Sequence, residues 1–313
     1  MHAVGVNEFG GPDALEVVEL PSPEVGAGQI RLRVRAAAVN PTDTYTRNGA
    51  RAELLAEQGP PPYVPGMDAA GHVDEIGPDV ETTLSVGDAV MAMVVPRGSN
   101  GAYASEVVVP AEAVVPIPAG TTLVEACTLP MNGLTARLAL DLLDLAPGST
   151  LAVTGSAGAF GGYVIQLAKV AGLTVIADAS EADEALVVGL GADHVVRRGP
   201  DVADRIREIV DGGVDGLADG SVQGDDLMAA VRDGGAIATV RGHEGPDDRG
   251  ITWHQVWVRE YERAHDEIDE LRMLVESGDL TLRVAETFTA EEASEAHRRL
   301  EQGGVRGRLV IEL

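Results

Sequence analysis

Residues 151–169 have the sequence LAVTGSAGAFGGYVIQLAK, and this stretch determines how the second half of the chain is organised. A short apolar run leads into a turn of small residues, which a segment of helix length follows. Small residues let the backbone approach a pyrophosphate, and a helix N-terminus offers free N–H groups and the positive end of its dipole. Tight turns and close helix packing use the same residues, but strand, turn and helix in this order favour a dinucleotide site. The residues predicted to bind the dinucleotide are Gly155, Ser156, Gly158, Ala159, Phe160 and Gly161.

From about residue 121 onward, short apolar runs alternate with segments of helix length. The runs are Leu151–Thr154, Thr174–Ala177, His194–Val196, Gly216–Ala218 and Ala236–Val240. Such alternation predicts βαβ units and a parallel sheet. Ligands of such sheets bind at the carboxyl ends of the strands, so Val240 and Gly242, which end the fifth run, are further candidate cofactor residues.

The first 118 residues and the tail show other patterns. Before residue 118, β-branched runs lie between Pro/Gly clusters, which predicts an irregular, mostly β domain. The tail predicts a helix at Glu260–Glu276, a strand at Leu282–Thr287, a helix at Ala290–Glu301 and a strand at Arg308–Leu313. A length of 313 residues agrees with two domains.

Composition excludes several classes of partner and site. The chain has 50 acidic and 23 basic residues, a net charge of −27, which repels nucleic acid and anionic membrane surfaces. The single cysteine, Cys127, excludes an intramolecular disulfide and a four-cysteine zinc site. The first residues lack the pattern of a signal peptide, and the uncharged stretch 145–168 is interrupted by Pro147 and five glycines, unlike a membrane span. We expect a cytoplasmic protein.

Two features bear on which dinucleotide binds. Asp178, at the end of the second predicted strand, could accept a hydrogen bond from the ribose 2′-hydroxyl of NAD. Arg197 and Arg198, after the third, could pair with the 2′-phosphate of NADP, or could be a solvated surface pair. The residues alone do not decide between NAD and NADP.

Several motifs, taken in order, are similar to those of one known family. They are Ala38–Gly49 with its Asn-Pro-Thr-Asp core, Tyr63–Gly71, Val86–Val90, Gly101–Ala104, Leu129–Ala136, the glycine turn with Gln166 and Lys169, and Leu190–Val196. The chain resembles the zinc-independent quinone oxidoreductase, or zeta-crystallin-like, branch of the medium-chain dehydrogenase/reductase superfamily. The resemblance extends over nearly the whole chain.

The resemblance implies an α/β fold of two domains. A discontinuous GroES-like β-barrel catalytic domain, residues 1–120 and 256–313, would accompany a doubly wound Rossmann domain, residues 121–255, with substrate in the interdomain cleft. Zinc-dependent relatives carry a cysteine ligand near position 40 and a Gly-His-Glu motif near position 66, where this chain has Asn40 and Gly66-Met67-Asp68. We therefore expect no catalytic zinc, and we expect His72 to be a strand histidine.

The resemblance also bears on the cofactor. Thr135 is similar to a family residue that bonds the nicotinamide side of the cofactor, and Arg198 falls near one that contacts the 2′-phosphate. The chain departs from the family at Ala159 and Phe160, and at residues 181–184, where acidic residues replace a lysine. We expect NADPH as cofactor, with Ser180 as a second phosphate donor and NADH as the alternative.

A nicotinamide enzyme without metal reduces acceptors that accept hydride readily, so quinones are the expected substrates and α,β-unsaturated carbonyls the alternative. Asn40 and Tyr45 are the candidate catalytic residues, as amide and phenol donors toward the acceptor oxygen. The competing interpretation is a structural turn in which Asp43 bonds local backbone. A non-catalytic dinucleotide-binding protein of the same fold is the second class. Loops near Arg47–Gln58 and Arg97–Asn100 are expected to set substrate specificity.

The apolar run Thr252–Val258 follows the fifth predicted strand. As an unpaired sheet edge it would favour pairing with a second copy of the chain. We therefore expect a homodimer.

Overall fold

The computed structural model describes residues 1–313, which divide into two compact units. The first unit consists of residues 1–131, 259–276 and 282–313, and the second of residues 132–258 and 277–281. The sequence-based prediction placed the boundaries near residues 120 and 255.

Six parallel strands form the sheet of the second unit, in the order β10-β9-β8-β11-β12-β13. Their bounds are β8 Thr150–Thr154, β9 Thr174–Ala179, β10 His194–Arg197, β11 Val214–Asp219, β12 Val231–Thr239 and β13 Thr252–Gln255. The chain passes outward from β8 to β10, returns to the middle, and passes outward again from β11 to β13. This reversal between β8 and β11 defines a doubly wound sheet, so the predicted parallel sheet is confirmed.

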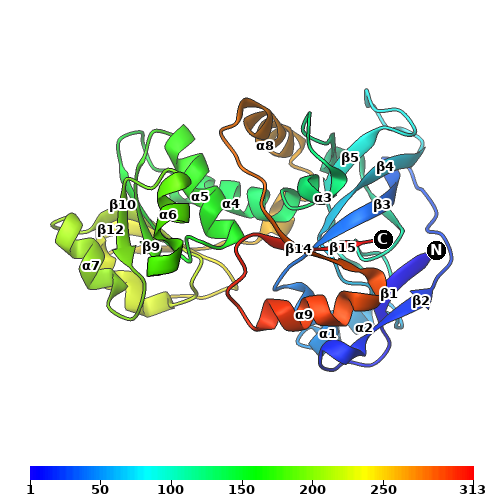
Figure 1. Cartoon of the computed structure of the whole chain (residues 1–313), viewed down its shortest axis with the longest axis horizontal. Coiled ribbons are helices and arrows are strands. Elements are labelled where there is room, and N and C mark those ends of the chain that lie inside the picture. The colour runs from blue at the N-terminus through cyan, green and yellow to red at the C-terminus, as the bar shows by residue number, and fades with distance from the viewer. The chain divides into compact units, whose positions relative to one another are not determined.

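Helices cover the sheet of the second unit (Figure 1). They are α4 Pro130–Leu143, which begins at the boundary between the units, α5 Ala159–Val170, α6 Glu184–Gly189 and α7 Val202–Ile209, with 3₁₀ turns η3 Glu181–Asp183 and η4 Gly224–Ala230. Val202 and Ile206 of α7 belong to one apolar cluster with Leu217 of β11 and Ile237 of β12. Strands buried along most of their length, as β8 and β9 are, are typical of parallel sheets covered on both faces.

The first unit is built on a mostly antiparallel sheet in the order β14-β15-β3-β4-β5-β7, with β6 paired to β3 and a separate β1–β2 pair. The strands are β1 His2–Val6, β2 Leu15–Glu19, β3 Gln29–Val39, β4 Asp68–Ile76, β5 Ala89–Met93, β6 Glu106–Pro110, β7 Val114–Pro116, β14 Val284–Thr289 and β15 Arg308–Glu312. Figure 1 shows the C-terminal strand β15, in red, beside β3, in blue, with which it pairs antiparallel. Strands from both ends of the chain thus enclose one apolar core that includes Val4, Leu32, Val90 and Ile311.

Apart from α8, the helices of the first unit are short. They are α1 Asp43–Asn48, α2 Ala52–Glu57, α3 Leu123–Ala126, α8 His265–Ser277 and α9 Ala293–Glu301, with 3₁₀ turns η1 Pro12–Ala14, η2 Ala111–Ala113, η5 Val258–Tyr261 and η6 Ala290–Glu292. Three expectations need correction: residues 47–58 are largely helical instead of a loop, α8 begins at residue 265 instead of 260, and β14 spans residues 284–289 instead of 282–287. His72 lies in β4, as expected. No helix combines the length and apolar character that a bilayer crossing requires.

Candidate active site

The glycine turn joins β8 to α5 in the second unit and is closely packed. Gly155 has a φ of 67°, in the left-handed region that favours glycine, and a Cβ there would lie 2.7 Å from the Gly220 backbone carbonyl carbon. A Cβ on Gly161 would lie 2.6 Å from the Gly155 oxygen, so α5 rests directly on the turn. Gly158 is the N-cap of α5, and the first N–H groups of a helix have no carbonyl partner within it. This geometry fits the pyrophosphate of a dinucleotide.

Phe160, one of the two departures from the turn of the resembled family, occupies the first turn of α5. Its ring lies against Gly220, where an added Cβ would be 2.9 Å from the ring. A glycine immediately after β11 therefore makes room for the larger side chain. Ala159, the other departure, is the first helical residue and half-buried.

Asp178, the residue that suggested NAD, supports the turn itself. Its Oδ1 accepts a hydrogen bond of 3.0 Å from the Ser156 N–H, and its own N–H donates to the Ser156 hydroxyl over 3.2 Å. Asp178 is 5% exposed, and burial raises the pKa of its carboxyl group against the lowering effect of the Ser156 hydrogen bonds. Asp178 and Ser156 therefore fix the end of β9 to the glycine turn.

The two residues predicted to contact the 2′-phosphate, Ser180 and Arg198, directly follow β9 and β10, which are neighbouring strands. The Arg198 N–H donates to the Ala179 carbonyl over 2.9 Å, and the exposed Arg198 side chain interacts electrostatically with Asp178. The Ser180 hydroxyl donates to Asp183 Oδ2 over 2.5 Å. Arg198 offers a cation here, while Asp183 adds a negative charge beside Ser180.

The remaining predicted cofactor residues lie in two other elements of the second unit. Arg241 and Gly242, after β12, have φ values of 68° and 75°, and a Cβ on Gly242 would lie 2.8 Å from the Trp257 ring. Val240 precedes this turn and is half-buried. Because the strands are parallel, this turn and the glycine turn both lie at the carboxyl-terminal end of the sheet. Thr135 is buried within α4.

One structural residue at this carboxyl-terminal end of the sheet, Asp219, was not predicted from the sequence. Asp219, at the end of β11, is 1% exposed, and its oxygens accept hydrogen bonds from the Thr154 hydroxyl and from the N–H groups of Ser221, Val222 and Gly224. Asp219 thereby ties the loop after β11 to the end of β8. An aspartate after an apolar run was the only local signal for this role.

Asn40 of the first unit is fully buried. Its side-chain N–H donates to Asp68 Oδ2 over 2.6 Å, and Asp68 Oδ1 accepts from the Met131 N–H over 2.6 Å. The backbone N–H of Asn40 donates to Asp43 Oδ2 over 2.8 Å, which confirms that Asp43 bonds local backbone. Burial raises the pKa of Asp43 to about 7 and that of Asp68 to about 6. Asn40 therefore connects the end of β3 to the start of β4, and it does not line the cavity described below.

A chain of hydrogen bonds leads to Asp43 from α9. Arg47, which also pairs with Glu301, lies 3.2 Å from His297 Nδ1, and His297 Nε2 lies 3.2 Å from the Tyr103 hydroxyl. Because arginine only donates, Nδ1 must accept and Nε2 must carry the proton. The Tyr103 hydroxyl in turn donates to Asp43 Oδ2 over 3.0 Å. Burial and the Arg47 charge lower the pKa of His297 to about 3, which agrees with a neutral ring.

Tyr45 lies on α1 beside a cavity of about 210 Å³ that α1, α2, the 95–97 segment and residues 259–262 enclose. The Arg51 guanidinium lies 5.3 Å from the centroid of the Tyr45 ring. The Tyr45 hydroxyl forms no hydrogen bond within the protein, in contrast to the Tyr103 hydroxyl. Residues of both segments expected to set specificity, including Arg51, Leu54 and Arg97, line this cavity.

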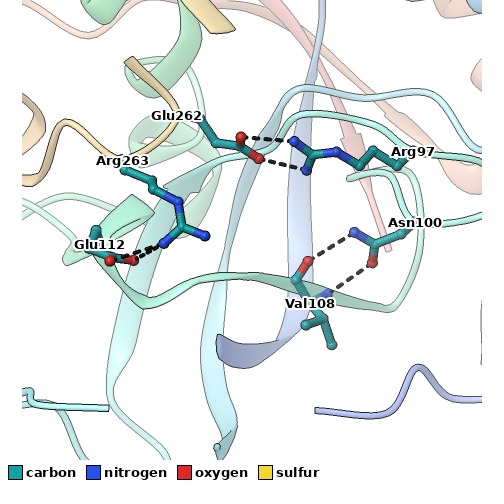
Figure 2. Close-up of polar contacts among 6 residues, drawn as sticks. All are labelled: Arg97, Asn100, Val108, Glu112, Glu262 and Arg263. Carbon is teal, nitrogen blue, oxygen red and sulfur yellow. Dashed lines mark hydrogen bonds and ion pairs between the residues drawn. The ribbon is translucent and has the colours of Figure 1, made fainter. Parts of the chain in front are cut away.

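Two ion pairs hold the 259–263 segment to the rest of the first unit (Figure 2). Arg97 donates to both carboxylate oxygens of Glu262, over 2.7 and 2.8 Å, and Arg263 donates to Glu112 over 3.0 Å. Asn100 exchanges two hydrogen bonds with the Val108 backbone and so fixes the loop that carries Arg97. One wall of the cavity is thus anchored by charge-assisted hydrogen bonds.

Comparison with known proteins agrees with this architecture. Residues 26–119 match the alcohol dehydrogenase GroES-like domain family, and residues 190–311 match the zinc-binding dehydrogenase family. A 2-haloacrylate reductase from Burkholderia sp is 34% identical over 324 residues, which cover 95% of this chain and 94% of that protein. The chain belongs to the medium-chain dehydrogenase/reductase superfamily.

Solved structures of this superfamily extend the likeness to the whole fold. The quinone oxidoreductase from Coxiella burnetii has a TM-score of 0.85 at 28% identity, covering 100% of this chain and 99% of that one. A mycobacterial protein solved in complex with NADPH has a TM-score of 0.86 at 29% identity, with both chains covered to 100%. The predicted resemblance to the quinone-oxidoreductase-like branch, and the predicted pairing of a GroES-like with a Rossmann-like domain, are confirmed.

One matched family of the superfamily is described as zinc-binding, and the residues of this chain do not fit a zinc ion. Asn40 and Asp68, where the resemblance would place metal ligands of zinc-dependent relatives, are bonded to each other, and Met67 accepts a hydrogen bond from Thr42. The Cys127 thiol is buried and donates to the Val124 carbonyl. No group of three His, Cys, Asp or Glu side chains is placed to hold a metal.

Proposed function

We propose that this oxidoreductase uses NADPH to reduce quinones without metal. The Asn40–Asp68 hydrogen bond carries the proposal, because it joins two side chains at the positions where the resemblance would place the zinc ligands of metal-dependent relatives. Without a Lewis acid, the acceptor itself must stabilise the negative charge that arrives with hydride, and a quinone does so across its conjugated ring. Asn40 stays a predicted catalytic residue, although its buried amide is engaged with Asp68.

The nicotinamide cofactor supplies the hydride when it is bound. The glycine turn and the first N–H groups of α5 would hold its pyrophosphate, and Arg198 would pair with the 2′-phosphate. The Tyr45 hydroxyl has no partner within the protein, so it is free to donate a hydrogen bond or a proton to the acceptor oxygen. The balance is one acceptor, one NADPH and one proton, giving the hydroquinone and NADP⁺.

A second candidate substrate class is the α,β-unsaturated carbonyls. The relative named 2-haloacrylate reductase, 34% identical over almost the whole chain, supports it. Here a hydride would reach the β-carbon and a proton the α-carbon. Quinones and unsaturated carbonyls share a double bond conjugated to a carbonyl, so the same donors serve both.

Metal removal tests the proposal. Exhaustive dialysis against a strong chelator, followed by metal analysis, is expected to leave the rate of quinone reduction unchanged. A rate that falls with the metal content and returns on adding Zn²⁺ contradicts the proposal. The proposal is also contradicted if the protein oxidises an alcohol with NADP⁺ but reduces no quinone with NADPH.

We also propose that the protein is a cytoplasmic homodimer. β13 lies at an edge of the parallel sheet, and its outer side has no strand partner. Such an edge pairs readily with a second copy of itself about a two-fold axis. The single, buried cysteine agrees with a reducing compartment.

A further inference from the structure

The cavity of the first unit carries positive charge in a strongly acidic protein. Acidic residues outnumber basic ones by 50 to 23 along the chain, yet three arginines, Arg51, Arg97 and Arg259, line this one cavity of about 210 Å³. The acidic residues that also line it are Asp43 and Glu262. Which of these charges cancel decides what the cavity can bind.

Arg97 and Glu262 cancel each other. Their bidentate pair, with both hydrogen bonds at 2.7–2.8 Å, uses both carboxylate oxygens, as Figure 2 shows. Asp43 forms no ion pair with the other arginines and acts on Arg51 only through its charge, which raises the pKa of Arg51 against the effect of burial. Its carboxylate instead accepts hydrogen bonds from the Asn40 N–H, the Gly66 N–H and the Tyr103 hydroxyl. Asp43 is 1% exposed, and all the hydrogen bonds of its carboxylate lie within the buried network.

Arg51 and Arg259 remain without a carboxylate. Neither forms a hydrogen bond or an ion pair with any residue of the chain, and the only contact of the Arg51 guanidinium with a ring is with Tyr45. Burial first, and then the positive charge of Arg259, lower the pKa of Arg51. Two guanidinium groups that repel each other at one cavity form a site for an anion, which would relieve the repulsion.

We propose that Arg51 and Arg259 bind the carboxylate of the acceptor, so that the physiological substrate is a small anionic molecule with a double bond conjugated to its acid group. This inference rests on the proposed reductase function and names its substrate class. Guanidinium groups pair with carboxylates in bidentate fashion. Leu54, Leu55 and Met67 line the same cavity and offer apolar contact to the carbon skeleton. A volume of about 210 Å³ suits a small molecule and is below the range of drug-sized pockets.

The reaction on such an acceptor balances without further reactants. Hydride forms the new C–H bond at the β-carbon, a proton from the protein or solvent forms the one at the α-carbon, and NADPH becomes NADP⁺. The carboxylate stays ionised throughout. Tyr45, whose ring the Arg51 guanidinium contacts, is the phenol donor beside this anion site.

The test compares 2-chloroacrylate with its uncharged analogue 2-chloroacrylamide in the full-length enzyme. The expected kcat/KM is at least about 10-fold higher for the acid, because a hydrogen bond to a charged group contributes roughly that factor. Arg51→Gln and Arg259→Gln should each lower kcat/KM for the acid about 10-fold more than for the amide and so remove most of this preference. Arg232→Gln is the control, since Arg232 pairs with Asp215 in the second unit and does not line the cavity. Glu262→Gln, which frees Arg97, should strengthen the preference.

A binding measurement separates this inference from the proposed function. Calorimetry with 2-chloropropionate, which has no double bond to reduce, is expected to show binding. Arg51→Gln and Arg259→Gln should each weaken this binding roughly 10-fold or more. The uncharged 2-chloropropionamide should not bind detectably. If quinones are reduced but neither acid binds or reacts in preference to its amide, the anion site is wrong and the reductase stands. If no acceptor is reduced while 2-chloropropionate binds through both arginines, the site stands and the proposed function is wrong. Equal competition by inorganic phosphate and by simple carboxylates overturns the assignment to a substrate carboxylate.

Discussion

Arg198 is the residue on which the choice between NADPH and NADH depends. Its side chain is exposed just after the end of β10, while Asp178 accepts a hydrogen bond from the Ser156 N–H and Asp183 one from the Ser180 hydroxyl. Arg198→Ala should raise the KM for NADPH about 10-fold or more and leave that for NADH almost unchanged, since only the 2′-phosphate pairs with a guanidinium. Initial rates with both cofactors measure this, with Arg197→Ala as the neighbouring control. Equal losses with both cofactors would show that Arg198 does not contact the phosphate.

Tyr45 is the residue most directly tied to proton or hydrogen-bond donation. Tyr45→Phe removes only a hydroxyl that has no partner within the protein, so thermal stability should be unchanged. Turnover should fall by roughly 10²-fold or more if the phenol acts as a general acid, and less if it only orients the acceptor. Tyr63→Phe serves as control, because its hydroxyl bonds the Gly59 carbonyl. Unchanged turnover in Tyr45→Phe removes Tyr45 from the mechanism.

Local contacts around Asn40 were predictable from the sequence, and distant ones were not. The Asn-Pro-x-Asp pattern predicted that Asp43 bonds nearby backbone, and the 2.8 Å bond from the Asn40 N–H confirms it. Tyr103 and His297, which complete the same network, are 194 residues apart, and no spacing rule connects them. The two unpaired arginines of the cavity were likewise not predictable, because pairing depends on side chains that only the fold brings together.

The β8–α5 turn tolerates little change in volume. Gly161→Ala places a Cβ 2.6 Å from the Gly155 oxygen and 2.7 Å from the Ser156 Cα, both rigid backbone atoms. We expect a loss of about 1–3 kcal/mol in the free energy of unfolding and weaker NADPH binding, because α5 must move off the turn. Gly189→Ala, in α6, meets nothing within 4 Å and is the control. Denaturant unfolding and NADPH titration measure both effects, and wild-type behaviour of Gly161→Ala would contradict the packing described.

The hydrogen-bonded chain from α9 to α1 makes stability depend on pH. The pKa of buried His297 is lowered to about 3, whereas an unfolded histidine has its ordinary value of 6.5. The stability that His297 contributes is therefore complete above pH 6.5 and falls as the pH drops toward 3, by about 2 kcal/mol at pH 5. His297→Gln, which does not titrate, should lose correspondingly less stability between pH 7 and 5.

The difference between variant and parent is the quantity to measure. Burial raises the pKa of Asp43 to about 7 and that of Asp68 to about 6, so these groups make the opposite contribution, stabilising the protein as the pH falls. Both are present in the parent and in His297→Gln, and they largely cancel in the difference. Exposed His194→Gln is the control. Parallel stability curves for parent and His297→Gln would contradict a buried neutral His297.

Elements with a repeated pattern were predicted better than isolated ones. The alternation of apolar runs located β8 to β12 because parallel strands buried on both faces are short and continuously apolar. The helix predicted from residue 260 begins at residue 265, since residues 258–261 form a 3₁₀ turn held by the Arg97 and Arg263 ion pairs. Residues 47–58 were expected to be loop because α1 and α2, with six residues each, are too short for a helical period to show.

At the scale of the whole molecule, the free edge of β13 predicts association. Light scattering at micromolar concentration should give twice the monomer mass, because backbone groups on the outer side of β13 have no partner strand. The mass should persist at high salt, since backbone pairing does not depend on the net charge of −27. A monomeric mass under both conditions contradicts the dimer.

The central claim is that the molecule reduces conjugated acceptors with NADPH, and initial rates of cofactor oxidation test it most directly. NADPH and NADH are each presented with an ortho-quinone, a para-quinone and an enal. We expect acceptor-dependent oxidation that is faster with NADPH, with one NADPH consumed per acceptor reduced. If the parent protein binds NADPH but oxidises it with none of these acceptors, the proposed reductase activity is contradicted. The protein would then be a non-catalytic dinucleotide-binding protein.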